Sequence, residues 1–194
     1  CQTHYGRTLD GVTRVTLKND AGHDYLEAKS TSLVERSQIL GNQFREGFKS
    51  FKASNWDPDI VISHSGWGCG LHVKEIWPKT NLISYLEWWF CPESDFFFYD
   101  TERNFISNND KNIKKSWLRN QQIALELCTS NEIVTPTEWQ RKQLPTSLQN
   151  KCHIIFDGID TNNFSPKRED QNKKNKNFIL TYGTRGFDPM RCFP

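Results

Sequence analysis

The residues best suited to chemistry lie in the segment Pro58–Trp77, which reads PDIVISHSGWGCGLHVKEIW. Within it, residues 60–62 (Ile-Val-Ile) form a short apolar run behind a turn, which predicts a strand covered on both faces. His64 falls just past the carboxyl end of this strand, where open parallel sheets bind ligands. Its imidazole can donate a hydrogen bond to a ligand hydroxyl without adding a fixed charge. The alternative is a histidine that bonds a loop carbonyl and stabilises the turn.

A glycine-rich turn follows the histidine. Gly66, Gly68 and Gly70 remove side chains where a phosphate or a sugar could approach backbone N–H groups at a helix start. Glycines also serve simply to make tight turns, so both interpretations stay open. Trp67 lies between two of them, where its ring could offer an apolar platform to a ligand ring or pack beneath the loop.

A carboxylate and a group of aromatic residues follow the next predicted strand. Glu87 precedes Trp88, Trp89 and Phe90, so its carboxylate could project into the same crevice beside an aromatic wall. Aromatic residues continue over positions 96–99 (Phe-Phe-Phe-Tyr). This cluster is either an acceptor-binding surface or, as for most large aromatic clusters, part of a core or a partner surface.

The elements that must position these residues alternate between strands and helices. Between residues 33 and 51 the apolar positions 33, 40, 44, 48 and 51 share one helical face, which predicts a long amphipathic helix. The other expected elements are strands at 12–17, 60–62, 81–86, 132–135 and 152–156, and helices at 67–76, 112–128 and 137–143. Alternating strands and helices predict an α/β fold with a doubly wound, parallel, Rossmann-like sheet.

Composition excludes several classes of protein. The chain has 194 residues, a net charge of +2 and 25% charged residues, without the one-sided basic excess of a nucleic-acid binder. No stretch approaches the roughly 18 apolar residues needed to span a bilayer, and no amino-terminal signal segment is visible. We therefore expect a cytoplasmic protein without a transmembrane segment, with room for peripheral membrane contact.

The cysteines do not form a metal-binding pattern. The six are scattered singly, so we expect isolated buried thiols, with a disulfide framework as the alternative. His72 and Glu75 are three positions apart on a predicted helix, but no third ligand is evident. No metal site is expected.

Four segments together resemble the family 4 glycosyltransferases, in particular a bacterial group whose strand ends in a His-x-Gly-Trp-Gly motif. The first segment, 58–77, carries that motif as HSGWG. Residues 133–145 (IVTPTEWQRKQLP) resemble a strand-to-helix turn of this family, and residues 153–160 (HIIFDGID) resemble a strand that ends in Asp-Gly-Ile-Asp. Residues 178–194 (FILTYGTRGFDPMRCFP) resemble the opening of its second domain.

The resemblance implies half of a two-domain, GT-B-type architecture. Residues 1–160 would be the amino-terminal, acceptor-side Rossmann-like domain, with its first strand missing. Residues 161–177 would be a charged linker, and residues 178–194 the first strand and loop of a truncated donor-binding domain. A chain cut in this way is expected to be inactive alone.

The resemblance also implies a reaction and its residues. A sugar would move from a nucleotide-sugar donor to a hydroxyl of a glycan or lipid-linked acceptor, with retention at the sugar carbon and without a metal or cofactor. His64 would be the catalytic residue that holds the donor sugar. Acceptor or sugar binding falls to Gly66, Trp67, Gly68 and Glu87. Binding of the donor diphosphate falls to Gly183, Arg185 and Arg191. Cys192 departs from the pattern, because the family is expected to carry glycine there.

Two other functions stay open from the sequence. The chain could be a non-catalytic module that binds a glycan or a protein through its aromatic residues. It could also belong to another sugar-nucleotide enzyme of GT-B architecture, such as an epimerase, because a fold does not fix a function.

Overall fold

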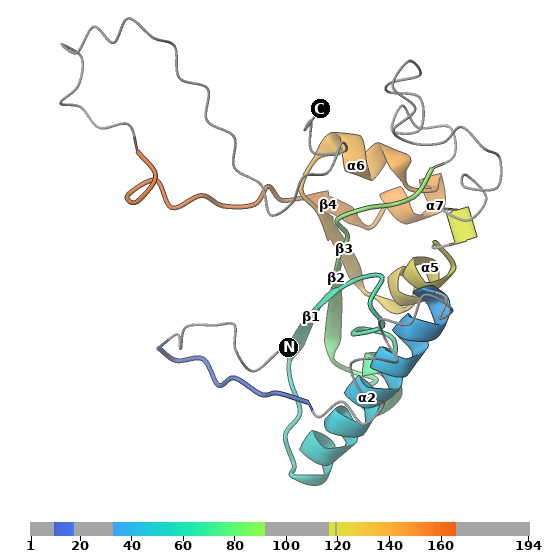
Figure 1. The fold of residues 1–194 in the computed structure, drawn as a ribbon, viewed down its shortest axis with the longest axis vertical. Helices are drawn as coiled ribbons and strands as arrows, with labels where there is room; N and C mark the ends of the chain where they lie inside the picture. Colours follow the sequence, from blue (N-terminus) through green and yellow to red (C-terminus); the bar gives the residue numbers. More distant parts are fainter. Residues whose placement is uncertain (1–9, 18–32, 92–116, 119, 166–194) are drawn as a thin grey trace, which may run out of the picture.

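The computed structural model describes residues 10–17, 33–91, 117–118 and 120–165 (Figure 1). Within them, four parallel strands form one sheet in the order β1-β2-β3-β4. The strands are β1 (Ile60–His64), β2 (Asn81–Tyr85), β3 (Glu132–Thr135) and β4 (Cys152–Ile154). The described helices are α2 (Leu33–Ala53), α3 (Val73–Ile76), α5 (Asn120–Thr129), α6 (Glu138–Gln143) and α7 (Thr146–Gln149). The expected Rossmann-like α/β class is confirmed.

A turn at the C-terminal end of helix α2 connects the helix to β1. Asn55 adopts a left-handed conformation with a φ of 59°. The Trp56 N–H then donates to the carbonyl of Phe51 over 3.0 Å, and the two rings pack with centroids 5.2 Å apart. A left-handed residue followed by this backbone bond and an apolar contact is a common way to end a helix. It reverses the chain so that β1 runs back along the helix.

The core lies between one face of the sheet and the helices beside it (Figure 1). Alternation along the strands sends Leu82 and Ile133 to this face, where both are 0% exposed. One cluster joins Leu82 to α3 and the end of that helix, and a second joins Ile133 to α5, α6 and α7. Each fully buried leucine or isoleucine contributes about 1.5–3 kcal/mol relative to exposure, so these residues fix the strand order on which the site depends.

The opposite face of the sheet corrects one expectation. Residues 60–62 were expected to be covered on both faces, but Ile62 is 73% exposed and Ile60 is 55% exposed. The reason is that β1 is the end strand of the described sheet and no described helix lies over this face. Of the three, Val61 is the residue that packs against the core.

Two expected elements differ from the structure. Residues 12–17 were expected to be a strand but have no regular secondary structure; Leu17 instead lies against Gly47 of α2. The helix expected from residue 67 begins only at Val73, because residues 67–72 form turns. Their conformation is fixed by contacts with α2 and α5, described below.

The remaining boundaries agree with expectation to within a few residues. The strand at 132–135 is confirmed at both ends, while β2 and β4 end one and two residues earlier than expected. The part of the expected helix at 112–116 lies outside the described residues, as do most of the expected linker and all of residues 178–194. None of the described helices is long and apolar enough to cross a membrane.

Four cysteines lie in the described part, and all four are free thiols. The expectation of buried thiols is right for Cys152 and wrong for Cys128, which is exposed on α5. Cys69 and Cys91 are half-buried. Cys1 and Cys192 lie outside the described residues.

Candidate active site

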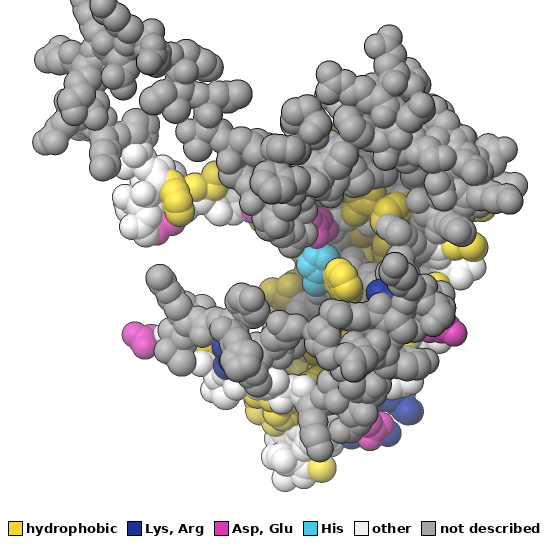
Figure 2. Space-filling model, in the orientation of Figure 1, with side chains coloured by type: hydrophobic (Ala, Val, Ile, Leu, Met, Phe, Trp, Pro, Cys, Tyr) yellow, Lys and Arg dark blue, Asp and Glu magenta, His cyan; other side chains and the backbone are white. Residues whose placement is uncertain are grey.

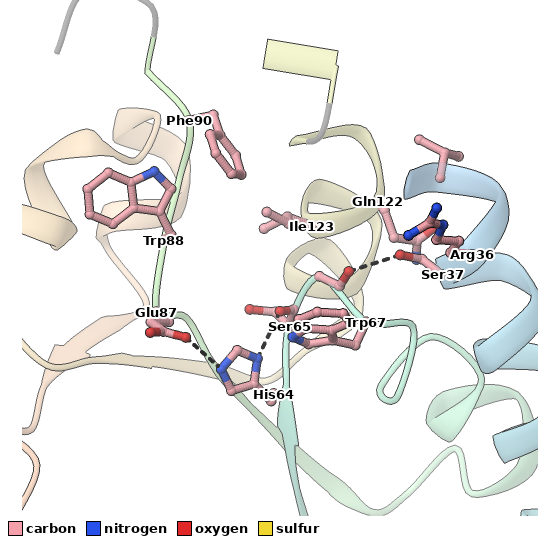
Figure 3. Close-up of a pocket in the computed structure, with 12 residues that line it drawn as sticks. Arg36, Ser37, His64, Ser65, Trp67, Glu87, Trp88, Phe90, Gln122 and Ile123 are labelled. Carbon is pink, nitrogen blue, oxygen red and sulfur yellow. Dashed lines mark hydrogen bonds and ion pairs between the residues drawn. The ribbon is translucent and has the colours of Figure 1, made fainter. Parts of the chain in front are cut away.

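A pocket of about 310 Å³ opens at the carboxyl ends of β1 and β2. Its walls come from α2, the turn after β1, the segment after β2 and α5. Figure 2 shows a histidine beside a hollow on this face, with hydrophobic and acidic side chains around it. Figure 3 shows the side chains that face one another there. The sequence-predicted residues among them are His64, Gly66, Trp67 and Glu87.

His64 is the last residue of β1, and both nitrogens of its ring face acceptor oxygens. Nδ1 lies 3.1 Å from the carbonyl oxygen of Ser65, and Nε2 lies 3.2 Å from Oε2 of Glu87 (Figure 3). The side chains of His64 and Glu87 are 40% and 64% exposed, so a ligand can reach both. The two interpretations of the histidine therefore coexist, because one nitrogen supports the turn while the other points toward the pocket.

Glu87 is placed by residues that follow β3. The side chain of Gln140, on α6, donates to the backbone carbonyl of Glu87 over 2.7 Å. Helix α6 is itself capped by Thr137, whose hydroxyl accepts from the Gln140 N–H at 3.3 Å and donates to the Gln140 side chain at 2.6 Å. The motif TPTEWQ thus acts locally as a helix cap and at longer range as a support for the carboxylate.

Aromatic rings form the wall beside this carboxylate. The rings of Trp88 and Trp139 pack with centroids 5.4 Å apart, so α6 also supports the wall. Phe90 is fixed through its backbone, because the amide of Asn120 accepts from its N–H at 2.9 Å and donates to its carbonyl at 2.6 Å. Asn120 is buried in α5 and does not line the pocket. Trp67 lies on the other side, 57% exposed and free to present its ring to a ligand.

The glycine-rich turn donates its amide protons to a protein carboxylate. The N–H groups of Gly66 and Gly68 both donate to Oε1 of Glu126 at 3.0 Å, and that of Gly70 donates to Oε2 at 3.3 Å. Glu126 lies in α5 and is 0% exposed. Burial raises its pKa, while the three amide hydrogen bonds lower it, and the net shift is upward. A phosphate or sugar that used these amides would have to displace the carboxylate.

The backbone conformation of the turn requires glycine at positions 66 and 68. Gly66 and Gly68 have φ values of 92° and 81°, and a Cβ at Gly68 would lie 2.1 Å from the carbonyl oxygen of Ser37. Ser37, on α2, also donates from its hydroxyl to the carbonyl of Gly66 at 2.9 Å. The residue beside it, Arg36, lines the pocket and brings a positive charge to its α2 wall.

The sequence patterns did not identify Arg36, Glu126 or Gln140 as site residues. Glu126 could have been recognised, because it is the one acidic residue inside the apolar stretch IALELC of a predicted helix. A charge on a buried helix face requires a partner. Arg36 and Gln140 carry no such signal, because each lies among the polar residues expected on the surface of an amphipathic helix.

Two further ionisable groups near the sheet edge have shifted pKa values. Burial, together with a hydrogen bond from its hydroxyl to Asp157 at 2.9 Å, raises the pKa of Tyr85 to about 12. Burial and the charge of Glu126 raise the pKa of the Cys69 thiol to about 11. The Asp157–Asp160 motif makes a turn rather than a carboxylate pair, because Asp160 accepts from the N–H groups of Asn162 and Asn163.

Other expected site residues are separate or not described. Residues 96–99, Gly183, Arg185 and Arg191 lie outside the described residues. Glu75 binds both His72 and Arg45, so its charge is already compensated. The described parts of the chain contain no group of three or more histidine, cysteine, aspartate or glutamate side chains that could hold a metal ion.

Comparison with known families assigns the chain to one family. Residues 1–164 match the sequence model of the glycosyl transferase family 4 group. The chain belongs to this family, whose members are glycosyltransferases. No curated protein matches it.

Proposed function

We propose that this domain binds the acceptor side of a sugar-transfer reaction, in which a nucleotide-sugar donor glycosylates an acceptor hydroxyl with retention. The observation that carries the proposal is the His64–Glu87 pair, which faces an aromatic-walled pocket at the carboxyl ends of β1 and β2 in a family 4 chain. Ligands of open parallel sheets bind at this edge.

The pair has the chemistry to hold a sugar hydroxyl. A hydroxyl group both accepts and donates one hydrogen bond. Placed between the two side chains, it would accept from Nε2–H of His64 and donate to the carboxylate of Glu87. The two groups are 3.2 Å apart in the structure, so their direct hydrogen bond would have to break to admit the hydroxyl. This arrangement would orient a sugar through one hydroxyl group.

The pocket walls suit the rest of a sugar or its acceptor. Trp67 would cover one face of a ring, and Trp88 and Phe90 would contact an apolar part of the acceptor. Gly66 and Gly68 contribute by letting the backbone carry Trp67 to the pocket rim, since their amides bond Glu126. Glycan and lipid-linked acceptors both offer such surfaces.

In the proposed reaction the acceptor oxygen attacks the anomeric carbon on the face from which the nucleotide leaves. The bond between that carbon and the phosphate oxygen breaks, and the hydroxyl proton passes to the departing diphosphate. Gly183, Arg185 and Arg191 would offset the charge that develops on the diphosphate. No metal or cofactor is required by this scheme, and the nucleotide-sugar is a substrate. Residues 1–160 would form the acceptor-side domain, 161–177 the linker and 178–194 the start of the donor side.

The test is sugar transfer by the full-length protein, screened over a panel of nucleotide-sugars and acceptors. His64→Ala should lower kcat/KM about 100-fold, as expected when a group that orients a substrate is removed. His153→Ala is the matched control, because His153 is also exposed and paired with a glutamate, Glu132, at 2.8 Å, but lies outside the pocket. Activity of the His64 variant within a few-fold of the His153 variant would contradict the proposal. Binding of sugars without turnover would favour a binding module, and epimerised donor would favour the epimerase.

A further inference from the structure

Among the described residues, the buried carboxyl group of Glu126 accepts three hydrogen bonds from the glycine-rich turn. The described turn runs from Ser65 to His72, between β1 and α3. Val73, which follows the turn, is buried, while Gly66 and Trp67 line the pocket, so the turn lies between the core and the pocket. What fixes the turn therefore also fixes one wall of the pocket.

The contacts are concentrated around Trp67. The two residues that flank it, Gly66 and Gly68, donate to the same oxygen, Oε1 of Glu126, at 3.0 Å each. Both have left-handed φ values, so neither has a strong intrinsic preference for the conformation it adopts here. A single carboxylate oxygen thus defines the direction in which the backbone presents the Trp67 side chain.

The same contacts extend to His64. Ser65 is joined to β2, since its N–H and its hydroxyl both donate to the carbonyl of Tyr85 at 2.9 Å. Its own carbonyl lies 3.1 Å from Nδ1 of His64. Movement of the turn at Gly66 would be transmitted through Ser65 to the imidazole, because no flexible residue lies between them.

The glycine amides have no other acceptor in the described structure. Gly68 and Gly70 are buried, so water does not replace a lost partner at no cost. A carboxylate offers acceptor oxygens to all three N–H groups, whereas an amide of the same shape would present its NH₂ group to one of them. The carboxylate therefore satisfies the turn more completely than an amide would.

We propose that Glu126 is a positioning residue, which acts through the amides of Gly66, Gly68 and Gly70 to hold Trp67 and His64 at the pocket rim. This inference rests on the proposed function in taking the pocket as the substrate site. Glu126 itself does not line the pocket and is not a catalytic residue.

Glu126→Gln is the first variant to test. Its amide oxygen can accept from Gly66 and Gly68, but the NH₂ group then faces the N–H of Gly70, donor against donor. Hydrogen-exchange mass spectrometry of the full-length protein should show exchange over residues 65–72 at least about tenfold faster, with strand β3 unchanged. The KM for the sugar donor or the acceptor should rise about tenfold, with a smaller change in kcat.

Matched variants separate positioning from a general loss of stability. Glu138→Gln removes an exposed carboxylate from α6 and should match the wild type in both measurements. Glu126→Asp keeps the charge but withdraws it by one methylene, and it should fall between the wild type and Glu126→Gln. If Glu126→Gln does not fold, the aspartate variant decides: raised exchange over 65–72 together with a raised KM supports the inference.

Two results would overturn the inference. One is exchange over residues 65–72 at the wild-type rate in a folded Glu126 variant. The other is faster exchange with unchanged KM and kcat. A wild-type protein that transfers no sugar would refute the proposed function instead, and the exchange comparison would still show whether Glu126 holds the rim.

Discussion

The side chain of Gln140 donates a hydrogen bond of 2.7 Å to the backbone carbonyl of Glu87, which joins α6 to the segment that follows β2. The two residues are 53 positions apart: Gln140 lies in one of the motifs by which the chain resembles family 4 glycosyltransferases, whereas Glu87 follows β2 outside those motifs. The capping turn at Thr137 fixes the orientation of Gln140. The motif at 133–145 therefore supports the backbone that carries the Glu87 carboxylate.

This relationship predicts the effect of Gln140→Ala. The variant should fold, because Gln140 is only half-buried on a short surface helix, but Glu87 and Trp88 should lose their support. We expect kcat/KM for sugar transfer to fall about tenfold, since small displacements of substrate-positioning groups have effects of this size or larger. Lys142→Ala, at an exposed position of the same helix, is the control and should keep full activity. Equal activities of the two variants would show that Glu87 does not depend on α6.

The His64–Glu87 pair should matter for activity much more than for stability. Both side chains are well exposed, and polar pairs at exposed positions contribute less than about 1 kcal/mol to the free energy of unfolding. If the two side chains bind one hydroxyl together, His64→Ala, Glu87→Ala and the double variant should lose similar amounts of kcat/KM. A double-mutant cycle on transfer activity measures this. Losses that simply multiply would mean that the two residues act independently.

Local patterns predicted much of the fold. The strand at 132–135 was predicted at both ends, because buried Ile133 and Thr135 alternate with outward residues and turns flank the run. Helix α2 was predicted from one apolar face, and it extends two residues further than expected, to Ala53. His64 and Glu87 were recognised because each comes at or just after the end of a strand, where the parallel topology brings such residues together.

Long-range contacts account for what the sequence did not predict. The turn at 67–72 was mistaken for a helix, because its conformation depends on Glu126, which is 56 to 60 residues away. The roles of Gln140 and Asn120 likewise depend on hydrogen bonds to distant backbone groups, one from Gln140 and two at Asn120. The exposure of Ile62 depends on which elements lie over a sheet face, and local alternation does not contain that information.

The two glycines Gly68 and Gly158 should respond very differently to alanine. At Gly68 the new Cβ would lie 2.1 Å from the backbone oxygen of Ser37 and the φ is 81°, so the turn or α2 must move. We expect a loss of several kcal/mol of stability, on the order of the 1–3 kcal/mol for backbone strain plus the cost of the clash. At Gly158 no atom lies within 4 Å, and alanine should be close to neutral. Urea unfolding compares the two, and equal midpoints would mean that the turn is not packed as described.

The thiol of Cys69 should be alkylated slowly, and its alkylation rate should depend on the charge of Glu126. Burial and the Glu126 charge raise its pKa to about 11, so about one molecule in a thousand carries the thiolate at pH 8. Alkylation by iodoacetamide, mapped by mass spectrometry, should modify exposed Cys128 well before Cys69. In Glu126→Gln the pKa of Cys69 should fall and its alkylation should accelerate, while Cys128 is unchanged. Equal rates for the two thiols in the wild type would contradict this picture.

The direction in which stability changes with pH should follow from the upward shift of the Glu126 pKa. Because burial raises its pKa above the ordinary 4.5, the folded protein binds more protons than the unfolded chain in the window between those two values. Stability then falls as pH rises through that window, and it levels off above the folded pKa. The free energy of unfolding of the wild type, minus that of Glu126→Gln, should therefore decrease as the pH is raised from about 4.

The pKa of Glu46 is shifted in the opposite direction from that of Glu126, so Glu46 provides a comparison. Its pKa is lowered by the hydrogen bond from Lys49, so its contribution is present above the unfolded pKa and is lost as pH falls through the folded value. The free energy of unfolding of the wild type, minus that of Glu46→Gln, should therefore increase with pH. The increase should be small because the Glu46–Lys49 pair is exposed. A Glu126 difference that also increased with pH would mean that the three glycine amides stabilise the carboxylate by more than burial destabilises it. The pKa of Glu126 in the folded protein would then lie below its ordinary value.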